Sequence, residues 1–267
     1  MEHLKIVASA QQLPEHQVTN QELSHIMDTN DDWIFSRTGI HQRHIVTTEN
    51  TSDLATSVAK QLLDKSGMTA DSLDFIIVST MSPDSLSPST AAIVQGAIGA
   101  TSAFAFDLSA ACSGFVYGLS VATSLLSTRY RRGLVIGSEV LSKLVDWQDR
   151  TTAVLFGDGA AGVLVETTTE NIGLLGEQLR TYGNKGDNLL AGQFANKNPF
   201  AGEISPVDPY FHQNGREVYN FATREVPEVL QAALEEAEVS ADDVDYYLLH
   251  QANARIVTSI AKRFGQP

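Results

Sequence analysis

The sequence predicts an α/β protein built from two similar halves. Apolar patterns with helical spacing alternate with short apolar runs typical of buried strands. In addition, residues 69–78 align with residues 240–249 without a gap. Each of these stretches follows an amphipathic helix and precedes a loop and a second helix, so an internal duplication explains the match better than chance. We therefore predict two α/β domains, covering residues 1–170 and 171–267.

The individual elements follow from local patterns of apolar residues and glycines. In the first half we predict helices through Leu54, Val58 and Leu62 and over 115–126, and strands at 75–78, 104–108, 133–137, 153–156 and 162–165, the last two joined by a glycine turn. Residues 180–215 are polar and rich in Gly, Asn and Pro, which predicts a loop or flap. The second half should add a helix over 226–237, a strand over 246–249 and a helix starting near Asn253.

The two halves differ in length. If they are equivalent, on the order of 65 residues of the first half have no counterpart in the second. We therefore expect the second half to be incomplete, with strand edges left unpaired.

Composition restricts the class of function. The formal charge is −14, which argues against general nucleic-acid binding, because phosphate contacts need a basic surface. An acidic protein partner would likewise need a local basic patch. No apolar run is long enough to span a membrane. With a single cysteine the chain forms no internal disulfide, which fits the cytoplasm.

That single cysteine, Cys112, lies where the strand 104–108 is expected to turn into a helix. A helix N-terminus offers unpaired N–H groups and partial positive charge, which stabilise a thiolate. The alternative is that Cys112 is a small buried apolar residue. His250 favours the first interpretation, because it ends a predicted strand and duplicated halves should bring equivalent strand ends together. A cysteine with a nearby histidine is the usual minimal pair for thioester chemistry.

Two other patterns carry little weight. The glycines of 157–162 match the letters of a dinucleotide-binding fingerprint, but a strand rather than a helix is expected to follow, so a hairpin turn is the better interpretation. His41 and His44 lack a third ligand at a recognisable spacing, so we predict no metal site and no cofactor.

Four separated motifs resemble one family. The segments 32–40, 106–115, 156–162 and 250–253 closely resemble β-ketoacyl-acyl-carrier-protein synthase III, the priming enzyme of bacterial fatty acid synthesis and a member of the thiolase-fold superfamily. The resemblance implies a thiolase-like fold of two duplicated halves in a layered α-β-α-β-α arrangement. It also implies an acyltransferase that condenses an acyl-CoA primer, typically acetyl-CoA, with malonyl-acyl carrier protein.

The resemblance assigns roles to residues. Cys112 would accept the acyl group, and His250 would donate a hydrogen bond to the malonyl thioester. The family's third catalytic residue, an Asn in a downstream Gly-Asn motif, is absent from this sequence. The remaining assignments are Trp33, Arg37 and Arg150 at the adenine end of CoA; Gly215, Ala252 and Asn253 along the pantetheine; Ser87 in the acyl pocket; and Arg255, Lys262 and Arg263 for the acyl carrier protein.

The family also implies a cytoplasmic homodimer. Two alternatives remain open: a truncated paralogue that no longer condenses and serves as a binding or dimerising subunit, and a degradative thiolase. The thiolase conflicts with the cysteine count, since thiolases use a second cysteine as acid and base.

Overall fold

The computed structural model describes residues 3–202 and 206–266 and divides the chain into two compact units. The first unit comprises Met1–Gln17, His44–Val140 and Gly157–Glu177, and the second comprises Val18–Arg43, Leu141–Phe156 and Gln178–Pro267. The predicted boundary at residue 170 is based on the internal repeat, whereas these two units are defined by contacts between residues. The predicted boundary stays a prediction.

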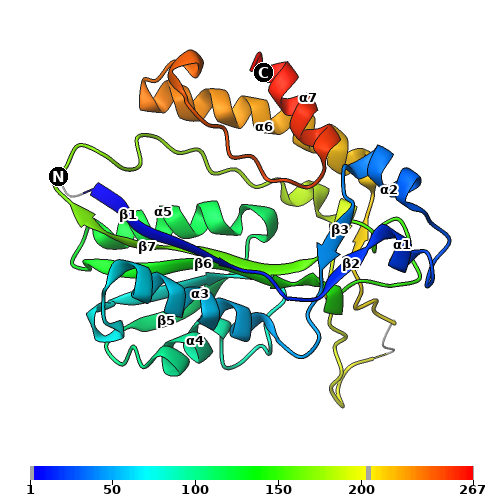
Figure 1. Cartoon of the computed structure of the whole chain (residues 1–267), viewed down its shortest axis with the longest axis horizontal. Helices are drawn as coiled ribbons and strands as arrows, with labels where there is room; N and C mark the ends of the chain where they lie inside the picture. Colours follow the sequence, from blue (N-terminus) through cyan, green and yellow to red (C-terminus); the bar gives the residue numbers. More distant parts are fainter. Residues whose placement is uncertain (1–2, 203–205, 267) are drawn as a thin grey trace. The chain divides into compact units, whose positions relative to one another are not determined.

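The first unit is built on a five-stranded sheet with the order β1-β7-β6-β4-β5 (Figure 1). Strand β4 lies between β5 and β6 and runs parallel to both, whereas β7 is antiparallel to β6 and β1. The strands are β1 (His3–Gln12), β4 (Phe75–Ser79), β5 (Phe104–Leu108), β6 (Arg132–Val140) and β7 (Asp158–Thr168). Every residue of β4 is buried, as the apolar run predicted.

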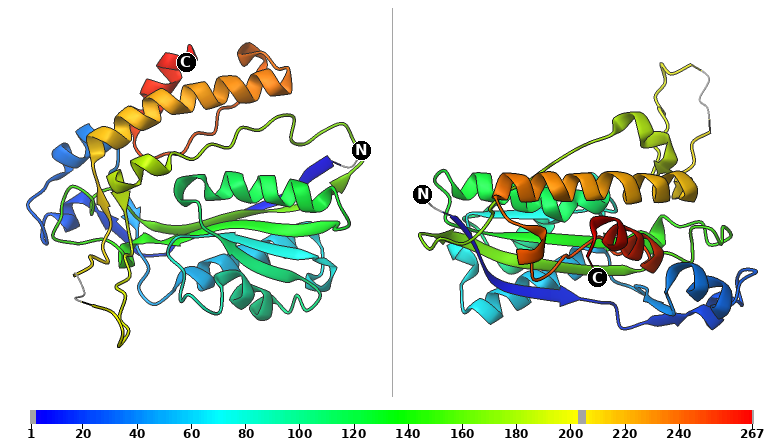
Figure 2. Two further views of the ribbon diagram at one scale, coloured as in Figure 1. Left: turned by 180° about the vertical axis from the view of Figure 1, so that it is seen from behind. Right: turned by 90° about the horizontal axis from the view of Figure 1, so that it is seen from above.

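Helices cover both faces of this sheet. Helices α3 (Thr51–Ser66) and α4 (Thr90–Ile98) pack on one face and α5 (Gly114–Leu126) packs on the other, as Figure 1 and the left view of Figure 2 show. The unit is therefore a three-layer α-β-α sandwich. The larger α-β-α-β-α arrangement of two halves stays a prediction.

The glycine-rich stretch 157–162 is not the hairpin turn that the sequence indicated. Residues 153–156 form a turn rather than a strand, and β7 begins at Asp158 and runs through the glycines. The reason is close packing at Gly162, where an added Cβ would lie 2.8 Å from the carbonyl oxygen of Val135. Glycine is needed there for the approach of two strands rather than for a turn.

The second unit is mainly helical. Its short helices α1 (Asn20–Leu23) and α2 (Asp31–Thr38) pack with 145–156 around Leu23, Met27 and Ile34. The other elements that lie wholly or mainly in this unit include β2 (Gln17–Thr19), β3 (Gln42–His44), the 3-10 helix η4 (Gly183–Asn188), β8 (Leu189–Leu190), β9 (His212–Gln213), α6 (Gly215–Ala237) and α7 (Ala254–Phe264). The stretches 178–202 and 206–214 are largely irregular, as predicted.

The predicted repeat recurs in local geometry. Helix α3 ends at Gly67 and α6 ends at Glu238, both in the left-handed conformation, with φ of 66° and 54°. In each copy the next N–H, of Met68 or Val239, returns to a carbonyl five residues earlier, as in a Schellman motif. A one-turn 3-10 helix follows in both copies, namely η1 (Ala70–Ser72) and η5 (Ala241–Asp243).

The repeat fails at one element. Residues 246–249 were predicted as a strand, but they have no regular structure, unlike their counterpart β4. Tyr246 and Leu248 are 83% and 91% exposed. A strand needs neighbouring strands for its backbone hydrogen bonds, and β4 has β5 and β6, whereas no described strand pairs with 246–249.

Candidate active site

Cys112 lies in a strained turn between β5 and α5. It belongs to the 3-10 helix η2 (Ala111–Ser113), and α5 begins two residues later at Gly114. The preceding residue, Ala111, has a φ of +46°, which is rare for a residue with a Cβ. Such strain persists only where the surroundings enforce it, and it often marks functional sites. The turn leaves Cys112 exposed to solvent.

The surroundings make the thiol a weaker acid than the sequence suggested. Although the residue is exposed, the protein atoms around its sulfur raise the pKa of Cys112, and the charge of Glu139 raises it further. The backbone N–H of Cys112 itself acts in the opposite direction and lowers this pKa. The expected thiolate stabilisation by the backbone is present but outweighed, so the prediction of a lowered pKa is wrong.

Glu139, which sequence reasoning missed, is the centre of a hydrogen-bonded network at the end of β6. Its carboxylate accepts hydrogen bonds from the N–H groups of Met81 and Ser82, at 2.9 and 3.1 Å, and from the hydroxyls of Thr80 and Ser82. Burial raises the pKa of Glu139, and these hydrogen bonds offset only part of that rise. A partly buried carboxylate with four donors forms a rigid anchor.

A second cluster, in the second unit, gathers the residues assigned to the adenine of CoA. Trp33 and Arg37 lie four residues apart on α2 and so share one face of the helix. The guanidinium carbons of Arg37 and Arg150 lie 4.6 and 4.9 Å from the centre of the Trp33 ring. Arg150 also donates a 2.6 Å hydrogen bond to the carbonyl of Asp28. An indole beside two cations suits a planar ring that carries phosphates.

Helix α7 begins against the end of α2. Gly39 ends α2 in the left-handed conformation, and a Cβ there would lie 2.9 Å from the Cβ of Ala254. Arg255 donates a 2.7 Å hydrogen bond to the carbonyl of Ser36. The N-terminus of α7 and the Trp33 cluster therefore lie side by side in this unit.

The histidine motif leads directly into α7. Asn253 is the N-cap of this helix and accepts a 2.9 Å hydrogen bond from the N–H of Ile256, a structural role that the sequence interpretation did not include. His250 is exposed, and the protein atoms around it lower its pKa, which favours the neutral imidazole at pH 7. Ala252 is partly buried, and Gly215 is the exposed first residue of α6.

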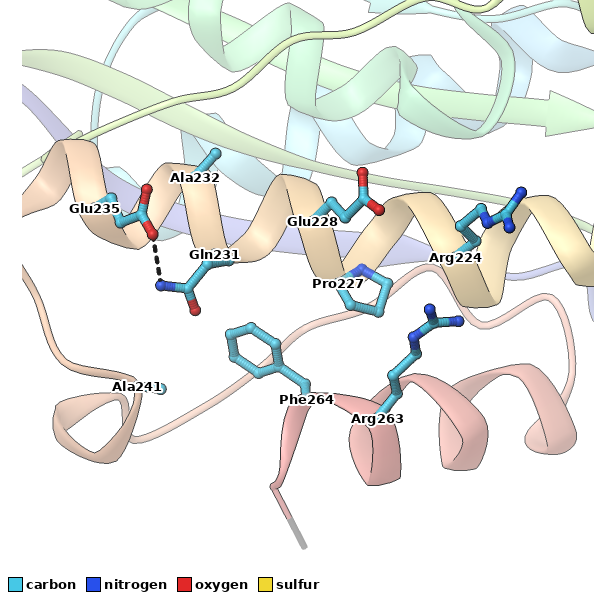
Figure 3. Close-up of a pocket in the computed structure, with 9 residues that line it drawn as sticks. All are labelled: Arg224, Pro227, Glu228, Gln231, Ala232, Glu235, Ala241, Arg263 and Phe264. Carbon is cyan, nitrogen blue, oxygen red and sulfur yellow. Dashed lines mark hydrogen bonds between the residues drawn. The ribbon is translucent and has the colours of Figure 1, made fainter.

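The remaining predicted residues are exposed. Ser87 lies in the loop between β4 and α4. Lys262 and Arg263 occupy the last turn of α7, where Arg263 donates a 3.1 Å hydrogen bond to the carbonyl of Thr223 on α6. A groove of about 450 Å³ lies between α6 and α7, and in Figure 3 Arg263 and Phe264 point from α7 toward α6. The residues lining this groove include Arg224 and Arg263, but neither Cys112 nor His250.

The structure brings one group of the predicted residues together. Trp33, Arg37, Arg150 and Arg255 lie around α2 in the second unit, and His250, Ala252 and Asn253 belong to the same unit. Cys112 and Ser87 belong to the first unit.

Within the described residues, no three His, Cys, Asp or Glu side chains gather as metal ligands. No helix of the described chain is long and apolar enough to cross a membrane.

Comparisons with known proteins identify relatives of this chain. Family models described as 3-oxoacyl-[acyl-carrier-protein] synthase III match residues 106–183, and the C-terminal model of that family matches residues 234–267. The chain is 54% identical over 266 residues to the β-ketoacyl-[acyl-carrier-protein] synthase III of Lactococcus lactis subsp. lactis, covering 99% of this chain and 82% of the relative. It is 53% identical over 269 residues to that of Limosilactobacillus reuteri, covering 100% and 83%.

Solved structures of such enzymes also resemble this chain in fold. The 3-oxoacyl-[acyl-carrier-protein] synthase III of Aquifex aeolicus has a TM-score of 0.91 at 38% identity, covering 99% of this chain and 82% of its own. The enzyme of Pseudomonas aeruginosa has the same TM-score at 32% identity, covering 99% and 80%. The alignments run over essentially the whole of this chain, and they do not confirm the predicted incompleteness of the second half.

These likenesses first define a class: the chain has the thiolase-like α/β fold of condensing enzymes. Identity above 50% over nearly the full sequence then defines the family. The chain belongs to the 3-oxoacyl-[acyl-carrier-protein] synthase III family of acyltransferases.

Proposed function

We propose that this chain condenses an acyl-CoA primer, acetyl-CoA in the simplest case, with malonyl-acyl carrier protein and so starts fatty acid synthesis. One observation supports this most strongly. This chain is 54% identical to a synthase III. Its single cysteine lies exposed in a strained turn, two residues before a helix.

The chemistry consists of two transfers. The Cys112 thiolate attacks the thioester carbonyl of acyl-CoA, the new C–S bond forms, and CoA leaves as its thiol after taking up a proton. Malonyl-acyl carrier protein then loses carbon dioxide, and the electron pair released forms an enolate. The nucleophilic carbon of this enolate attacks the acyl carbonyl on Cys112. The bond between the acyl group and the sulfur then breaks, so that the 3-oxoacyl product leaves and the cysteine is restored.

His250 is the proposed hydrogen-bond donor to the malonyl thioester oxygen, on which negative charge develops. The lowered pKa of His250 supports this role, since a neutral imidazole keeps one N–H to donate at pH 7. The family's second donor, an Asn in a Gly-Asn motif, has no counterpart after Asn253 in this sequence. The decarboxylating step is therefore to be measured separately from acyl transfer.

Binding of CoA is proposed at the Trp33 cluster. The adenine would stack on the indole, and Arg37 and Arg150 would pair with the phosphates. Gly215, Ala252 and Asn253 would line the path of the pantetheine, and Ser87 would border the acyl pocket. The geometry of Trp33, Arg37 and Arg150 supports the first of these assignments.

The acyl carrier protein is the proposed macromolecular partner. Arg255 and Arg263 both carry guanidinium groups hydrogen-bonded to backbone carbonyls, and Lys262 adjoins Arg263 in the last turn of α7. In a chain with a formal charge of −14, these cations supply a local basic surface for an acidic partner.

We also propose a cytoplasmic homodimer that needs no metal or cofactor. Strand β5 is the last strand of the sheet, and its sequence Phe-Ala-Phe-Asp-Leu is apolar yet only partly buried. An uncovered apolar edge strand favours pairing with a second copy of the chain.

The test is a condensation assay with acetyl-CoA and malonyl-acyl carrier protein. The parent protein should yield the 3-oxoacyl product, and His250→Ala should lower its rate by about 100- to 1000-fold, as for loss of one oxyanion donor. An acylated Cys112 without any condensation product would instead favour the alternative, a binding or dimerising subunit. Absence of both would contradict the proposed function.

A further inference from the structure

We propose that Glu139 is a positioning residue for the nucleophile: its carboxylate fixes the segment 80–82, to which the turn of Cys112 is attached, and so places a negative charge close to that turn. The inference rests on the proposed function, because it concerns the residue that would accept the acyl group.

The mechanical part follows from a continuous set of hydrogen bonds. Glu139 holds Thr80, Met81 and Ser82 through four donors. One residue earlier, the Ser79 hydroxyl donates a 2.8 Å hydrogen bond to the carbonyl of Gly114, at the start of the helix that follows Cys112.

Two further bonds complete this connection. The N–H of Thr80 bonds to the carbonyl of Leu108 at 3.1 Å, at the end of the strand that precedes Cys112. The N–H of Val140 bonds to the Ser82 hydroxyl at 2.9 Å, which ties the network to the end of β6. Both sides of the Cys112 turn are therefore attached to the segment that Glu139 anchors.

The electrostatic part follows from the donors around the carboxylate. The N–H groups of Met81 and Ser82 can only donate, so they require acceptor oxygens and favour an ionised Glu139. A fixed negative charge near a thiol disfavours the thiolate. Glu139 is the charged group that acts on Cys112 in this way among the residues that the structure describes.

Other titratable groups near this edge of the sheet are engaged elsewhere. Asp107 on β5 accepts hydrogen bonds from the N–H groups of Thr90 and Ala91 at the start of α4. Asp84 accepts from the N–H and hydroxyl of Ser52 at the start of α3. Asp158 on β7 accepts from the N–H of Val46. On α5 itself, Tyr117 is the titratable residue.

The experiment measures alkylation of the thiol by iodoacetamide, followed by intact mass between about pH 6 and 10. Because Cys112 is the only cysteine, the signal reports on it alone. Four proteins are compared: the parent, Glu139→Gln, Ser82→Ala and Glu166→Gln. Ser82→Ala weakens the network but keeps the charge. Glu166→Gln removes an equal charge from the other end of the β6–β7 pair, where Glu166 pairs with Arg132 at 2.9 Å.

We expect Glu139→Gln to move the alkylation profile to lower pH and to react about 3- to 10-fold faster at neutral pH, since removal of a like charge favours the thiolate. Ser82→Ala and Glu166→Gln should follow the parent profile. An unchanged profile for Glu139→Gln would overturn the proposal. Equal shifts for Glu139→Gln and Ser82→Ala would also overturn it, because they would show that the charge of Glu139 adds nothing to the effect of its hydrogen bonds.

Thermal unfolding checks that each variant is folded. If Glu139→Gln is not, Glu139→Asp keeps the charge and should retain the parent profile, and a shift to lower pH would count against the proposal. Incubation of the parent with acetyl-CoA separates the two claims. A normal acyl adduct on the parent, with no shift in the alkylation profile of Glu139→Gln, would refute only the role of Glu139. A shift in that profile without an adduct on the parent would refute only the proposed function.

Discussion

Arg43 is a cation buried among carbonyl and amide oxygens in the second unit. It is 5% exposed, and it donates to the carbonyls of Val18 and Val154 and, at 2.7 Å, to the side-chain oxygen of Asn20. Burial lowers the pKa of Arg43. By joining three separate segments, this side chain holds in place the core against which Trp33 packs.

Replacement of Arg43 should therefore destabilise the second unit. Arg43→Met keeps much of the volume but leaves three oxygens without their donor, so the free energy of unfolding should fall by about 2–4 kcal/mol. Urea unfolding measures the change. Arg216→Ala, on an exposed part of α6, is the matched control and should change stability by less than about 0.5 kcal/mol. A loss for Arg43→Met no larger than that of the control would contradict this role.

Sequence reasoning found Cys112 because a lone cysteine between a strand and a helix is a local pattern. It could not find Glu139 or Arg43, since both act through segments distant along the chain. For the same reason it gave the wrong sign for the acidity of the thiol. That sign depends on the sum of burial, backbone and charge around the sulfur, and a linear pattern contains only the backbone contribution.

At the scale of elements, prediction succeeded where a segment's own residues decide its structure. Helix α3 has an Asn50 capping box and a Gly67 end, and β5 has the predicted bounds. It failed at 153–156 and 246–249, where apolar residues resemble strands but have no strand partner in the described structure. Strands depend on neighbours that no local pattern reveals.

Helix α5 illustrates how an element positions the nucleophile. Gly114, Gly118 and Ala122 recur every four residues and form the buried face of the helix. A Cβ on Gly118 would lie 2.9 Å from a methyl group of Val135, closer than side chains normally pack. The glycines therefore let α5 lie close to the sheet, with Cys112 at its start.

Gly118→Ala should accordingly lower the free energy of unfolding by about 1–3 kcal/mol through overpacking. The matched control is Gly96→Ala within α4, where nothing lies within 4 Å of an added Cβ. That substitution should stabilise the protein by about 0.5–1 kcal/mol, because alanine favours the helix. Changes of the same sign in thermal unfolding of the two variants would contradict the packing argument.

At the scale of the whole molecule, the duplication was predictable because residues 69–78 align with residues 240–249 without a gap. The ends of α3 and α6 repeat the same left-handed cap, even though one copy uses Gly67 and the other Glu238. A glutamate with a φ of +54° is strained, and it persists because the surrounding motif supplies its hydrogen bonds. The proposed dimer rests on the family resemblance and on the partly exposed edge strand β5.

The proposed dimer can be tested at the edge of the sheet. Phe104 on β5 is 38% exposed and Phe200, in the irregular stretch 178–202, is 94% exposed. If β5 pairs with a second copy, Phe104→Lys should convert a dimer into a monomer in sedimentation experiments, because a charge at an edge strand opposes pairing. Phe200→Lys should leave the dimer intact. A monomeric parent, or equal behaviour of the two variants, would contradict the dimer through β5.

The central claim is that Cys112 accepts the acyl group, and intact-mass measurement after incubation with acetyl-CoA tests it most directly. The account predicts one acetyl adduct on the parent protein, faster at alkaline pH because the raised pKa of Cys112 leaves less thiolate at neutral pH, and no adduct on Cys112→Ala. An unmodified parent under these conditions, or an equal adduct on Cys112→Ala, would contradict it.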